Sequence, residues 1–334
     1  MTDINKRSEL LFFYDIENAN PNGDPNDENK PRIDEETGRN IVTDVRLKRT
    51  IRDYLHENGK DIFVQEKVYD QEGHIQDAKL RALDYLKDQE DLSDKKAEEQ
   101  KQIIARNILS ECIDVRLFGA TIPLDLKVKD GKDKTKSVSS SLTYTGPVQF
   151  KMGKSVHGVK IMHVKGTGAF ASKEGATKKT FREEYVLPYS LIGFYGIINE
   201  NAAKHTKLTI EDVADLKKAM WNGTKGLITR SKFGQMPRLL LSITYKEPDF
   251  FIGELDNRIR LKAECIDSKI RKPEDYAVDL TELVETIKAH QNKIERVGYV
   301  SDRKMTYILD GKPVTLDSEE LKKLNFKDES AEVL

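Results

Sequence analysis

The pattern of apolar and polar positions predicts a strand, a loop and a helix at the start of the chain. Residues 9–17 form a short apolar and aromatic run, which is typical of a buried strand. Residues 18–32 are rich in Asn, Asp, Gly and Pro and therefore predict a long loop. In residues 44–57, Leu47, Ile51 and Leu55 recur at helical spacing, so an amphipathic helix is expected there, capped by Thr43 or Asp44.

Further elements follow from the same reading of the chain. Residues 126–141 are rich in Lys and Ser and have no core pattern, which predicts a flexible excursion, and residues 165–182 form a second polar excursion. The other expected elements, in chain order, are a strand at 62–69, helices at 77–87 and 93–112, strands at 146–150 and 158–164, an apolar stretch at 185–199, a helix at 209–221 and a strand at 238–245.

This order of elements favours an α+β fold with helices on one face of an antiparallel sheet. An RNA-recognition-motif (ferredoxin-like) core with large insertions is the expected architecture. We expect residues 1–250 to form that core, with excursions at about 125–141 and 165–182. Residues 251–334 are expected to be a peripheral addition, with a helix at 279–294 and a hairpin at 305–316 that turns at Asp310 and Gly311.

Composition limits the classes of function. Charged residues make up 34% of the chain, yet 56 Lys and Arg against 57 Asp and Glu leave a net charge of -1, so any nucleic-acid site must be local. The two cysteines, Cys112 and Cys265, are far apart, which excludes a disulfide framework and a cysteine zinc site. The apolar run near the start is too short for a signal peptide or a membrane span, so a cytoplasmic protein without a membrane partner is expected.

Basic residues gather on the helix expected at 44–57. Lys48 and Arg52 are four residues apart, and like charges at this spacing destabilise a helix by a few tenths of a kcal/mol. A helix that tolerates this repulsion can be one that faces an anion, with Arg46 and Arg49 beside the pair. A solvated basic face explains the pattern equally well.

Two other segments carry basic residues in loops. The excursion at 165–182 has small residues between its basic residues. It can lie along a nucleic-acid backbone or form a flexible solvated loop. Its candidate RNA-binding residues are Lys165, Phe170, Lys178, Lys179 and Arg182. The segment at 229–238 is rich in hydrogen-bond donors and contains Arg230 and Lys232.

Common catalytic and metal-binding patterns are missing from the sequence. The six histidines lack H-E-x-x-H spacing, and there is no nucleophile elbow. The loop after residue 17 matches a calcium loop poorly, because Asn18 and Asn29 stand where an acidic first ligand and a bidentate Glu belong. Carboxylates such as Asp15, Glu17 and Asp34 could hold Mg²⁺ but are more typical of a solvated loop. We therefore predict no catalytic residue, no metal and no cofactor.

Several motifs in a fixed order resemble one known family. The segments are FYDIENANPNGDP at 13–25, PRIDEETG at 31–38, IVTDVRLKRTIRD at 41–53, DVRLFGA at 114–120, GPVQF at 146–150 and VLPYSLIGFYG at 186–196. The chain resembles the Cas-seven family, the repeated backbone subunit of type I CRISPR Cascade complexes, in its subtype I-B and I-C branch. The resemblance covers roughly residues 9–245.

The resemblance implies a right-hand-shaped subunit with an RNA-recognition-motif palm, an inserted finger region and a thumb hairpin. The helix at 44–57 and the Asn-rich loop before it are then expected to line the RNA backbone, and residues 165–182 fall where the thumb belongs. The implied RNA-binding residues are Asn18, Asn20, Asn22, Thr43, Arg46, Lys48, Arg49 and Arg52. The basic loop residues named above, which belong to no family motif, complete the set of candidate RNA-binding residues.

The leading hypothesis is a protein without enzymatic activity that polymerises along crRNA in a type I-B-like Cascade and presents the guide for pairing with target DNA. The implied partners are crRNA, the target DNA strand through the guide, further copies placed head to tail, and the 5′-end cap subunit, the large subunit and the crRNA-processing endonuclease. Two alternatives remain open. One is a metal-dependent RNase of the type III-like backbone class that uses Asp24, Asp27 or Asp34. The other is an RNA-recognition module that acts alone on cellular RNA.

Overall fold

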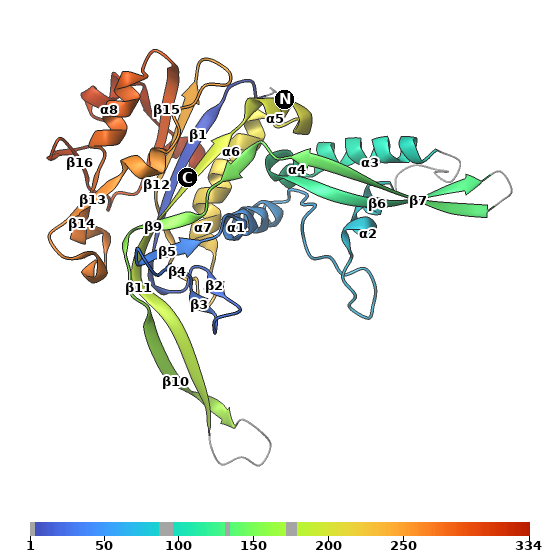
Figure 1. The fold of residues 1–334 in the computed structure, drawn as a ribbon, viewed down its shortest axis with the longest axis horizontal. Coiled ribbons are helices and arrows are strands. Elements are labelled where there is room, and N and C mark those ends of the chain that lie inside the picture. The colour runs from blue at the N-terminus through green and yellow to red at the C-terminus, as the bar shows by residue number, and fades with distance from the viewer. Residues whose placement is uncertain (1–3, 87–95, 131–133, 172–178) are drawn as a thin grey trace. The chain divides into compact units, whose positions relative to one another are not determined.

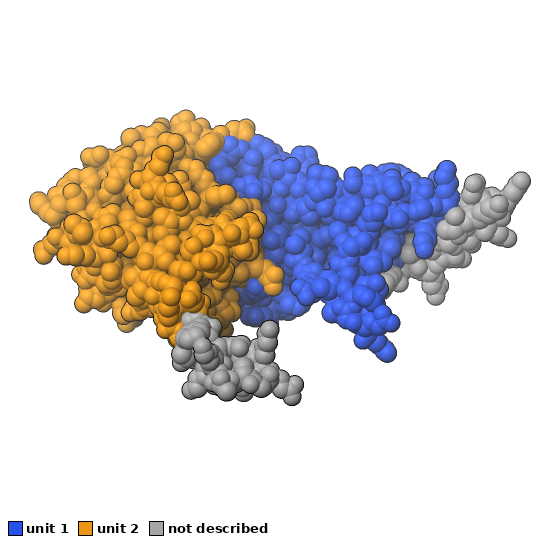
Figure 2. Space-filling model, turned by 60° about the horizontal axis from the view of Figure 1, so that its bottom comes forward, with its two compact units in different colours: residues 1–7, 52–149, 197–216 blue, residues 8–51, 150–196, 217–334 orange. Residues whose placement is uncertain are grey.

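The computed structural model describes residues 4–86, 96–130, 134–171 and 179–334. The chain forms two compact units, each assembled from separate stretches of sequence (Figure 2). Unit 1 comprises residues 1–7, 52–149 and 197–216, and unit 2 comprises residues 8–51, 150–196 and 217–334. The boundary expected near residue 250 falls inside unit 2.

Helices occur in both units (Figure 1). Within the described ranges, no helix is long and apolar enough to cross a membrane. The α-helices are α1 Asp44–Glu57, α2 Ala78–Leu83, α3 Ala97–Glu111, α4 Ile113–Phe118, α5 Glu200–Thr206, α6 Ile210–Lys218, α7 Thr224–Gly226, α8 Thr281–Ala289, α9 Glu319–Lys322 and α10 Ser330–Val333. Shorter helical turns are η1 Asp84–Leu86, η3 Ala219–Gly223, η4 Leu255–Arg258, η5 Asp267–Lys269 and η6 Pro273–Asp275.

The strands range from two-residue pairs to long, twisted elements. They are β1 Ser8–Ala19, β2 Gly23–Asp24, β3 Lys30–Pro31, β4 Ile33–Asp34, β5 Arg39–Val42, β6 Gly119–Asp130, β7 Lys134–Thr145, β8 Val148–Phe150, β9 Gly153–Gly158, β10 Met162–Ala171, β11 Lys179–Ile198, β12 Met236–Tyr245, β13 Arg260–Ala263, β14 Tyr276–Asp279, β15 Ile294–Ser301, β16 Tyr307–Leu309, β17 Lys312–Val314 and β18 Phe326–Asp328.

A large sheet organises unit 2. Its strand order is β18-β15-β12-β1-β11-β9-β5-β4, and β8 and β10 also pair with β11. The predicted first strand is confirmed as β1, which pairs antiparallel with β12, the predicted strand at 238–245. Residues 9–16 of β1 are buried on both faces, which explains why this segment is a continuous apolar run rather than an alternating one.

The C-terminal segment is part of the unit 2 core rather than a peripheral addition. β15 pairs antiparallel with β12 from Ile294 to Ser301, and β18 adds a parallel strand beside β15. Residues of α8, such as Leu283 and Ile287, share one apolar cluster with Leu11 of β1. The predicted hairpin is confirmed as β16 and β17, whose turn residues Asp310 and Gly311 both have positive φ. The helix predicted at 279–294 is shorter and forms α8; at its start the Asp279 carboxylate accepts the backbone N–H of Thr281.

The predicted helix at 44–57 is confirmed as α1. Leu47, Ile51 and Leu55 are at most 4% exposed, so the apolar stripe faces the protein interior as its spacing indicates. The helix is followed by Gly59, whose φ of 79° is in the left-handed region that favours glycine. The polar face of α1 is thereby left with the basic residues discussed below.

In unit 1, β6 and β7 form a long antiparallel ribbon where the sequence indicated an excursion without a core pattern (Figure 1). That expectation is wrong for the described residues, because the segment alternates with a period of two. Ile122, Leu124 and Leu126 are buried against α3, whose Ile104 and Ile108 belong to the same apolar cluster. Ser137, Ser139 and Ser141 are exposed and mark the other face of the ribbon.

The strand predicted at 62–69 is also wrong. The backbone N–H groups of Phe63 and Val64 donate to the buried carboxylate of Asp114, at 2.8 and 3.0 Å, and thus need no neighbouring strand. Val64, Val68 and Tyr69 are about half exposed, so the apolar character of this segment does not reflect burial in a sheet. The segment is an irregular loop with an isolated bridge from Val68 to Ile75.

A long two-stranded arm extends from the sheet of unit 2 (Figure 1). Its strands are β10 and the first part of β11, paired from Met162 with Val186 to Gly166 with Arg182 and beyond. The strand predicted at 158–164 is divided differently, since β9 ends at Gly158 and β10 begins at Met162. The predicted excursion at 165–182 is therefore largely paired strands, and residues 172–178 lie outside the described residues.

Candidate nucleic-acid interface

The Asn-rich loop holds the start of α1. The side-chain oxygen of Asn22 accepts hydrogen bonds from the backbone N–H and the hydroxyl of Thr43, both at 2.9 Å. This contact satisfies a donor next to the helix start that would otherwise need water. Asn22 and Thr43, two of the predicted site residues, are thus in direct contact at the junction of loop and helix.

The same loop also contacts the basic segment before β12. The backbone N–H of Asn20 donates to the carbonyl of Ser231 at 2.8 Å, and the Asn20 amide donates to the carbonyl of Asn29 at 2.7 Å. Asn20 is only 3% exposed, so these hydrogen bonds fix the loop against residues 229–235. Asn18, by contrast, is exposed and has a φ of 49° where β1 leaves the sheet.

Arg46 of α1 and Lys232 come close together as a consequence. The positive charge of Arg46 contributes to a lowered pKa of Lys232, after the main cause, which is burial of the ammonium group. Arg46 donates to the hydroxyl of Thr50 at 2.9 Å, and Lys232 contacts the hydroxyl of Ser231 at 3.3 Å. We call Asn20, Asn22, Thr43, Arg46 and Lys232 the Arg46–Lys232 cluster. Two cations that raise each other's electrostatic energy form a site where an anion is stabilised.

An exposed aromatic ring lies next to this cluster in sequence. Phe233 is 65% exposed although it follows Lys232 directly, and Gly234 after it has a φ of 87°. Exposed aromatic side chains beside cations are the usual platform on which proteins stack nucleobases. Phe233 was not predicted from the sequence, although the Lys-Phe-Gly triplet in a polar loop was a signal for it.

Lys48 and Arg52 have carboxylate partners inside the protein. Lys48 contacts Asp44 at 3.0 Å, and Arg52 contacts the buried Asp114 at 3.0 Å while lying over the ring of Phe118. The repulsion expected between them is thus offset by ion pairs rather than by an external anion. Arg49 is exposed on the same helix. RNA contact by these three residues stays a prediction.

The base of the β10–β11 arm is connected to the Asn-rich loop. The Tyr185 hydroxyl donates to Glu28 at 2.8 Å, and the ammonium of Lys30 lies 5.1 Å from the centre of the Tyr185 ring. Two predicted site residues also pair with this arm: Lys165 contacts Glu183 at 3.4 Å, and Arg230 contacts Glu184 at 3.0 Å. Both remain largely exposed on their outer sides.

The remaining predicted residues of the arm are Phe170, Lys178, Lys179 and Arg182. Lys178 lies outside the described residues, and the backbone alone is described for the other three. Arg182 is paired with Gly166 and Lys179 with Ala171, which places both on β11 of the arm.

The carboxylates of the Asn-rich loop are engaged locally. Asp24 pairs with Arg32 at 2.7 Å, and Asp27 pairs with Lys30 at 2.6 Å. Asp34 accepts from the backbone of Glu36, and a hydrogen bond from Thr37 is the main cause of its lowered pKa. Among the residues that the structure describes, no three His, Cys, Asp or Glu side chains are arranged to hold a metal ion.

The whole chain is similar to known proteins. The family model described as CRISPR-associated protein Cas7 matches residues 6–281. The chain belongs to this family. A curated Cas7 family relative, the CRISPR-associated protein Cas7 of Haloferax volcanii, is 36% identical over 315 residues, which cover 91% of this chain and 89% of the relative. The resemblance to the Cas-seven family is thereby confirmed.

One solved structure similar to this Cas7 family member agrees with a mixed α and β fold. A chain of a CRISPR RNA-guided surveillance complex in a pre-nicking state has a TM-score of 0.50 at 14% identity, covering 90% of this chain and 93% of that one. A chain of another CRISPR RNA-guided surveillance complex has a TM-score of 0.44 at 14% identity and covers 90% of each chain. The family match ends at residue 281, before β15, although β15 belongs to the main sheet.

Proposed function

We propose that this Cas7 family member is a crRNA-binding backbone subunit of a type I-B-like Cascade, the CRISPR RNA-guided surveillance complex of antiviral defence. The observation that carries the RNA-binding part is the Arg46–Lys232 cluster, in which residues from α1, the Asn-rich loop and the segment before β12 converge. Family membership over residues 6–281 supports the backbone role.

The cluster has the chemistry of a phosphate site next to a stacking surface. Arg46 and Lys232 supply positive charge without sequence preference, and the amides of the Asn-rich loop supply further hydrogen-bonding groups. The exposed Phe233 can stack on any base, because every base has an aromatic face. This combination fits a protein that holds a guide by its backbone and leaves the base edges free for pairing with target DNA.

We propose that the two ribbons are the finger and the thumb of the subunit. We assign the β6–β7 ribbon with α2 and α3 as the finger region and the β10–β11 arm as the thumb. The palm of the RNA-recognition-motif type would then be built on β1, β11 and β12. Antiparallel ribbons that extend from a core can reach an adjoining copy. Head-to-tail contact of this kind generates an open helical assembly, which suits a guide longer than one protomer covers.

The proposal includes no catalytic step for this subunit and no cofactor. The RNase alternative needs a metal held by Asp24, Asp27 or Asp34, and each of these carboxylates already has a partner within the loop, such as Arg32 or Lys30. The proposed protein partners are the 5′-end cap subunit, the large subunit and the crRNA-processing endonuclease. We propose that the complex acts in the cytoplasm.

Binding of the purified chain to single-stranded RNAs of unrelated sequence, with and without Mg²⁺, tests the function. We expect equal affinity for the different sequences, a steep loss of affinity with salt, and intact RNA after incubation with Mg²⁺. Mg²⁺-dependent cleavage that an Asp24→Ala, Asp27→Ala or Asp34→Ala variant abolishes would establish the RNase instead. A strong preference for one sequence would favour the separate RNA-recognition module.

A further inference from the structure

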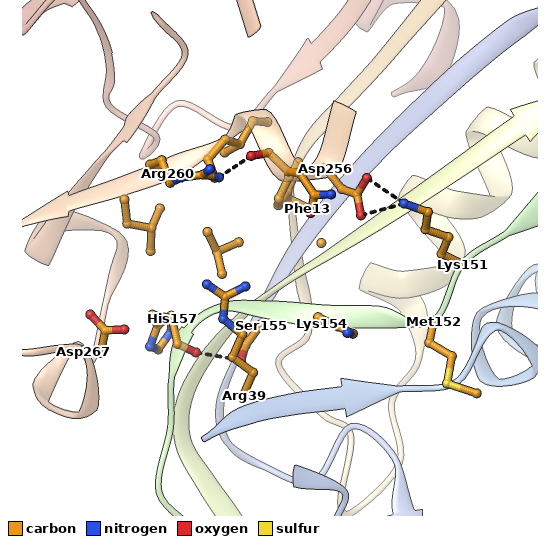
Figure 3. Close-up of a pocket in the computed structure, with 15 residues that line it drawn as sticks. Phe13, Arg39, Lys151, Met152, Lys154, Ser155, His157, Asp256, Arg260 and Asp267 are labelled. Atoms are coloured by element: carbon orange, nitrogen blue, oxygen red, sulfur yellow. Dashed lines mark hydrogen bonds and ion pairs between the residues drawn. The ribbon is translucent and has the colours of Figure 1, made fainter. Parts of the chain in front are cut away.

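A cavity of about 450 Å³ lies between the sheet of unit 2 and the segment that precedes and includes β13. Its floor includes Phe13 and Gly193, from β1 and β11. Its walls carry cationic side chains from separate elements, namely Arg39 of β5, Lys151, Lys154 of β9 and Arg260 of β13. Figure 3 shows the Arg39 guanidinium pointing into the cavity, with Arg260 on the opposite wall.

The charges around the cavity do not balance. Lys151 pairs with Asp256 at 3.2 Å, and Asp267 accepts the backbone N–H of Gly158 at 2.9 Å, so both lining carboxylates are engaged. Arg260 contacts Glu282, outside the cavity, at 3.7 Å. Arg39 and Lys154 form no ion pair with any described residue, although the charge of Lys154 is a minor cause of the lowered pKa of Asp34.

The buried histidine of the cavity adds no charge. His157 is 2% exposed, and burial is the main cause of its lowered pKa, to which the charge of Arg39 also contributes. One ring nitrogen lies 3.0 Å from the carbonyl of Gly158, and the other accepts the backbone N–H of Leu191 at 3.3 Å, an arrangement of the neutral imidazole. The anion-attracting groups are therefore Arg39 and Lys154, with Arg260 near them.

The cavity continues toward the start of α1 along one edge of the sheet. Ile41 of β5 is paired with Lys154 of β9, and Arg39 is the first residue of β5, two positions before Ile41. Ile41 and Thr43 line an adjacent hollow of about 350 Å³, and Met152 lines both this hollow and the cavity. Thr43 belongs to the Arg46–Lys232 cluster. An RNA strand that runs from the cluster past Met152 therefore reaches Lys154 and Arg39.

We propose that this cavity binds a phosphate group of the same RNA strand that the Arg46–Lys232 cluster contacts. The inference rests on the proposed function, and it adds a second anchor in the cavity beyond Met152. A phosphate group offers oxygens in several directions and can accept from Arg39 and Lys154 together, which come from different strands. A strand held at both places has a fixed path along β5 and over Met152.

The test compares an Arg39→Gln and Lys154→Gln double variant with the wild-type chain and with a matched control. Lys262→Gln with Lys269→Gln removes the same charge from exposed side chains that do not line the cavity. Affinity is measured against salt for RNAs of increasing length. We expect the cavity variant to bind long RNAs about tenfold more weakly, with a salt slope smaller by about one, and to bind the shortest RNAs like the wild type. The control should match the wild type at every length.

The possible failures are distinguishable. If the wild type binds RNA and the cavity variant equals the control at all lengths, the second anchor does not exist, while the proposed function stands. If the cavity variant keeps its RNA affinity but its complexes hold fewer protein copies, the cavity receives a carboxylate of an adjoining copy, which also overturns the inference. If the cavity variant loses the same affinity for RNAs of every length, Arg39 and Lys154 belong to the same RNA contact as the Arg46–Lys232 cluster. That result refutes a separate anchor. If the wild type binds no RNA, both proposals fail.

Discussion

Replacing Glu329 with alanine should lower the free energy of unfolding by about 3–5 kcal/mol, the range for removing one partner of a buried ion pair. The Glu329 side chain is 3% exposed and accepts from the Lys217 ammonium at 2.7 Å and pairs with Arg296 at 3.1 Å. Burial already lowers the pKa of Lys217, since Glu329 offsets only part of the cost of its charge. Without Glu329 the ammonium of Lys217 retains the hydroxyl of Ser242, at 2.9 Å, as an uncharged hydrogen-bond acceptor.

Urea unfolding of the wild type and the variant measures this effect, with Glu320→Ala as the control for loss of a carboxylate. Glu320 is exposed on α9, so its replacement should change stability by less than about 0.5 kcal/mol. A loss below about 1 kcal/mol for Glu329→Ala would mean that the C-terminal residues are not integral to unit 2. The expected loss would show that they stabilise the sheet, although the family match ends before them.

Replacing Arg46 and Lys232 together with glutamine should weaken binding to single-stranded RNA about a hundredfold, whatever the sequence of the RNA. Hydrogen bonds to charged groups contribute roughly 1.5–3 kcal/mol each, and two such contacts to phosphate are lost. The slope of affinity against salt should fall as well, because fewer counterions are released from the RNA. Fluorescence anisotropy titrations at several salt concentrations give both quantities.

Two further variants distinguish the effect of positive charge in the Arg46–Lys232 cluster from the effect of the protein's total positive charge. Lys225→Gln with Arg303→Gln also removes one lysine and one arginine, both exposed and outside the cluster, and should leave RNA affinity within about twofold. Lys232→Arg keeps the charge and should bind RNA at neutral pH. Because the pKa of Lys232 is lowered, wild-type affinity should fall as pH rises toward the usual lysine range, before that of Lys232→Arg. Equal losses of RNA affinity in all three variants would contradict a specific role for the cluster.

The parts of the fold that could be predicted are those that local sequence patterns determine. α1 has the apolar spacing, the cap and the following Gly59, and it begins and ends as expected. β1 has an apolar run that only burial on both faces explains. The β16–β17 hairpin follows from Asp310 and Gly311, which adopt the positive φ values that a tight turn requires.

The failures arose where distant partners decide the structure. The lysines and serines of β6 and β7 concealed an alternation that matters only because α3 covers Ile122 and Leu124. The segment at 62–69 has β-forming residues, but the Asp114 carboxylate takes its backbone donors. No local pattern indicates either contact, because both depend on residues more than ten positions away.

The candidate site shows the same division. Sequence placed Asn22, Thr43 and Arg46 near one another because they flank one helix start. It grouped Lys48 with Arg52 by spacing, whereas the structure gives each its own carboxylate and brings Arg46 to Lys232 instead. That pairing depends on the hydrogen bond from Asn20 to Ser231, which joins segments more than two hundred residues apart.

The mass of complexes between the purified chain and single-stranded RNAs of increasing length tests the central claim most directly. A backbone subunit should give a number of protein copies that rises in steps with RNA length, with the RNA intact in the presence of Mg²⁺. One copy per RNA regardless of length, or shortening of the RNA that depends on Mg²⁺, would contradict the account.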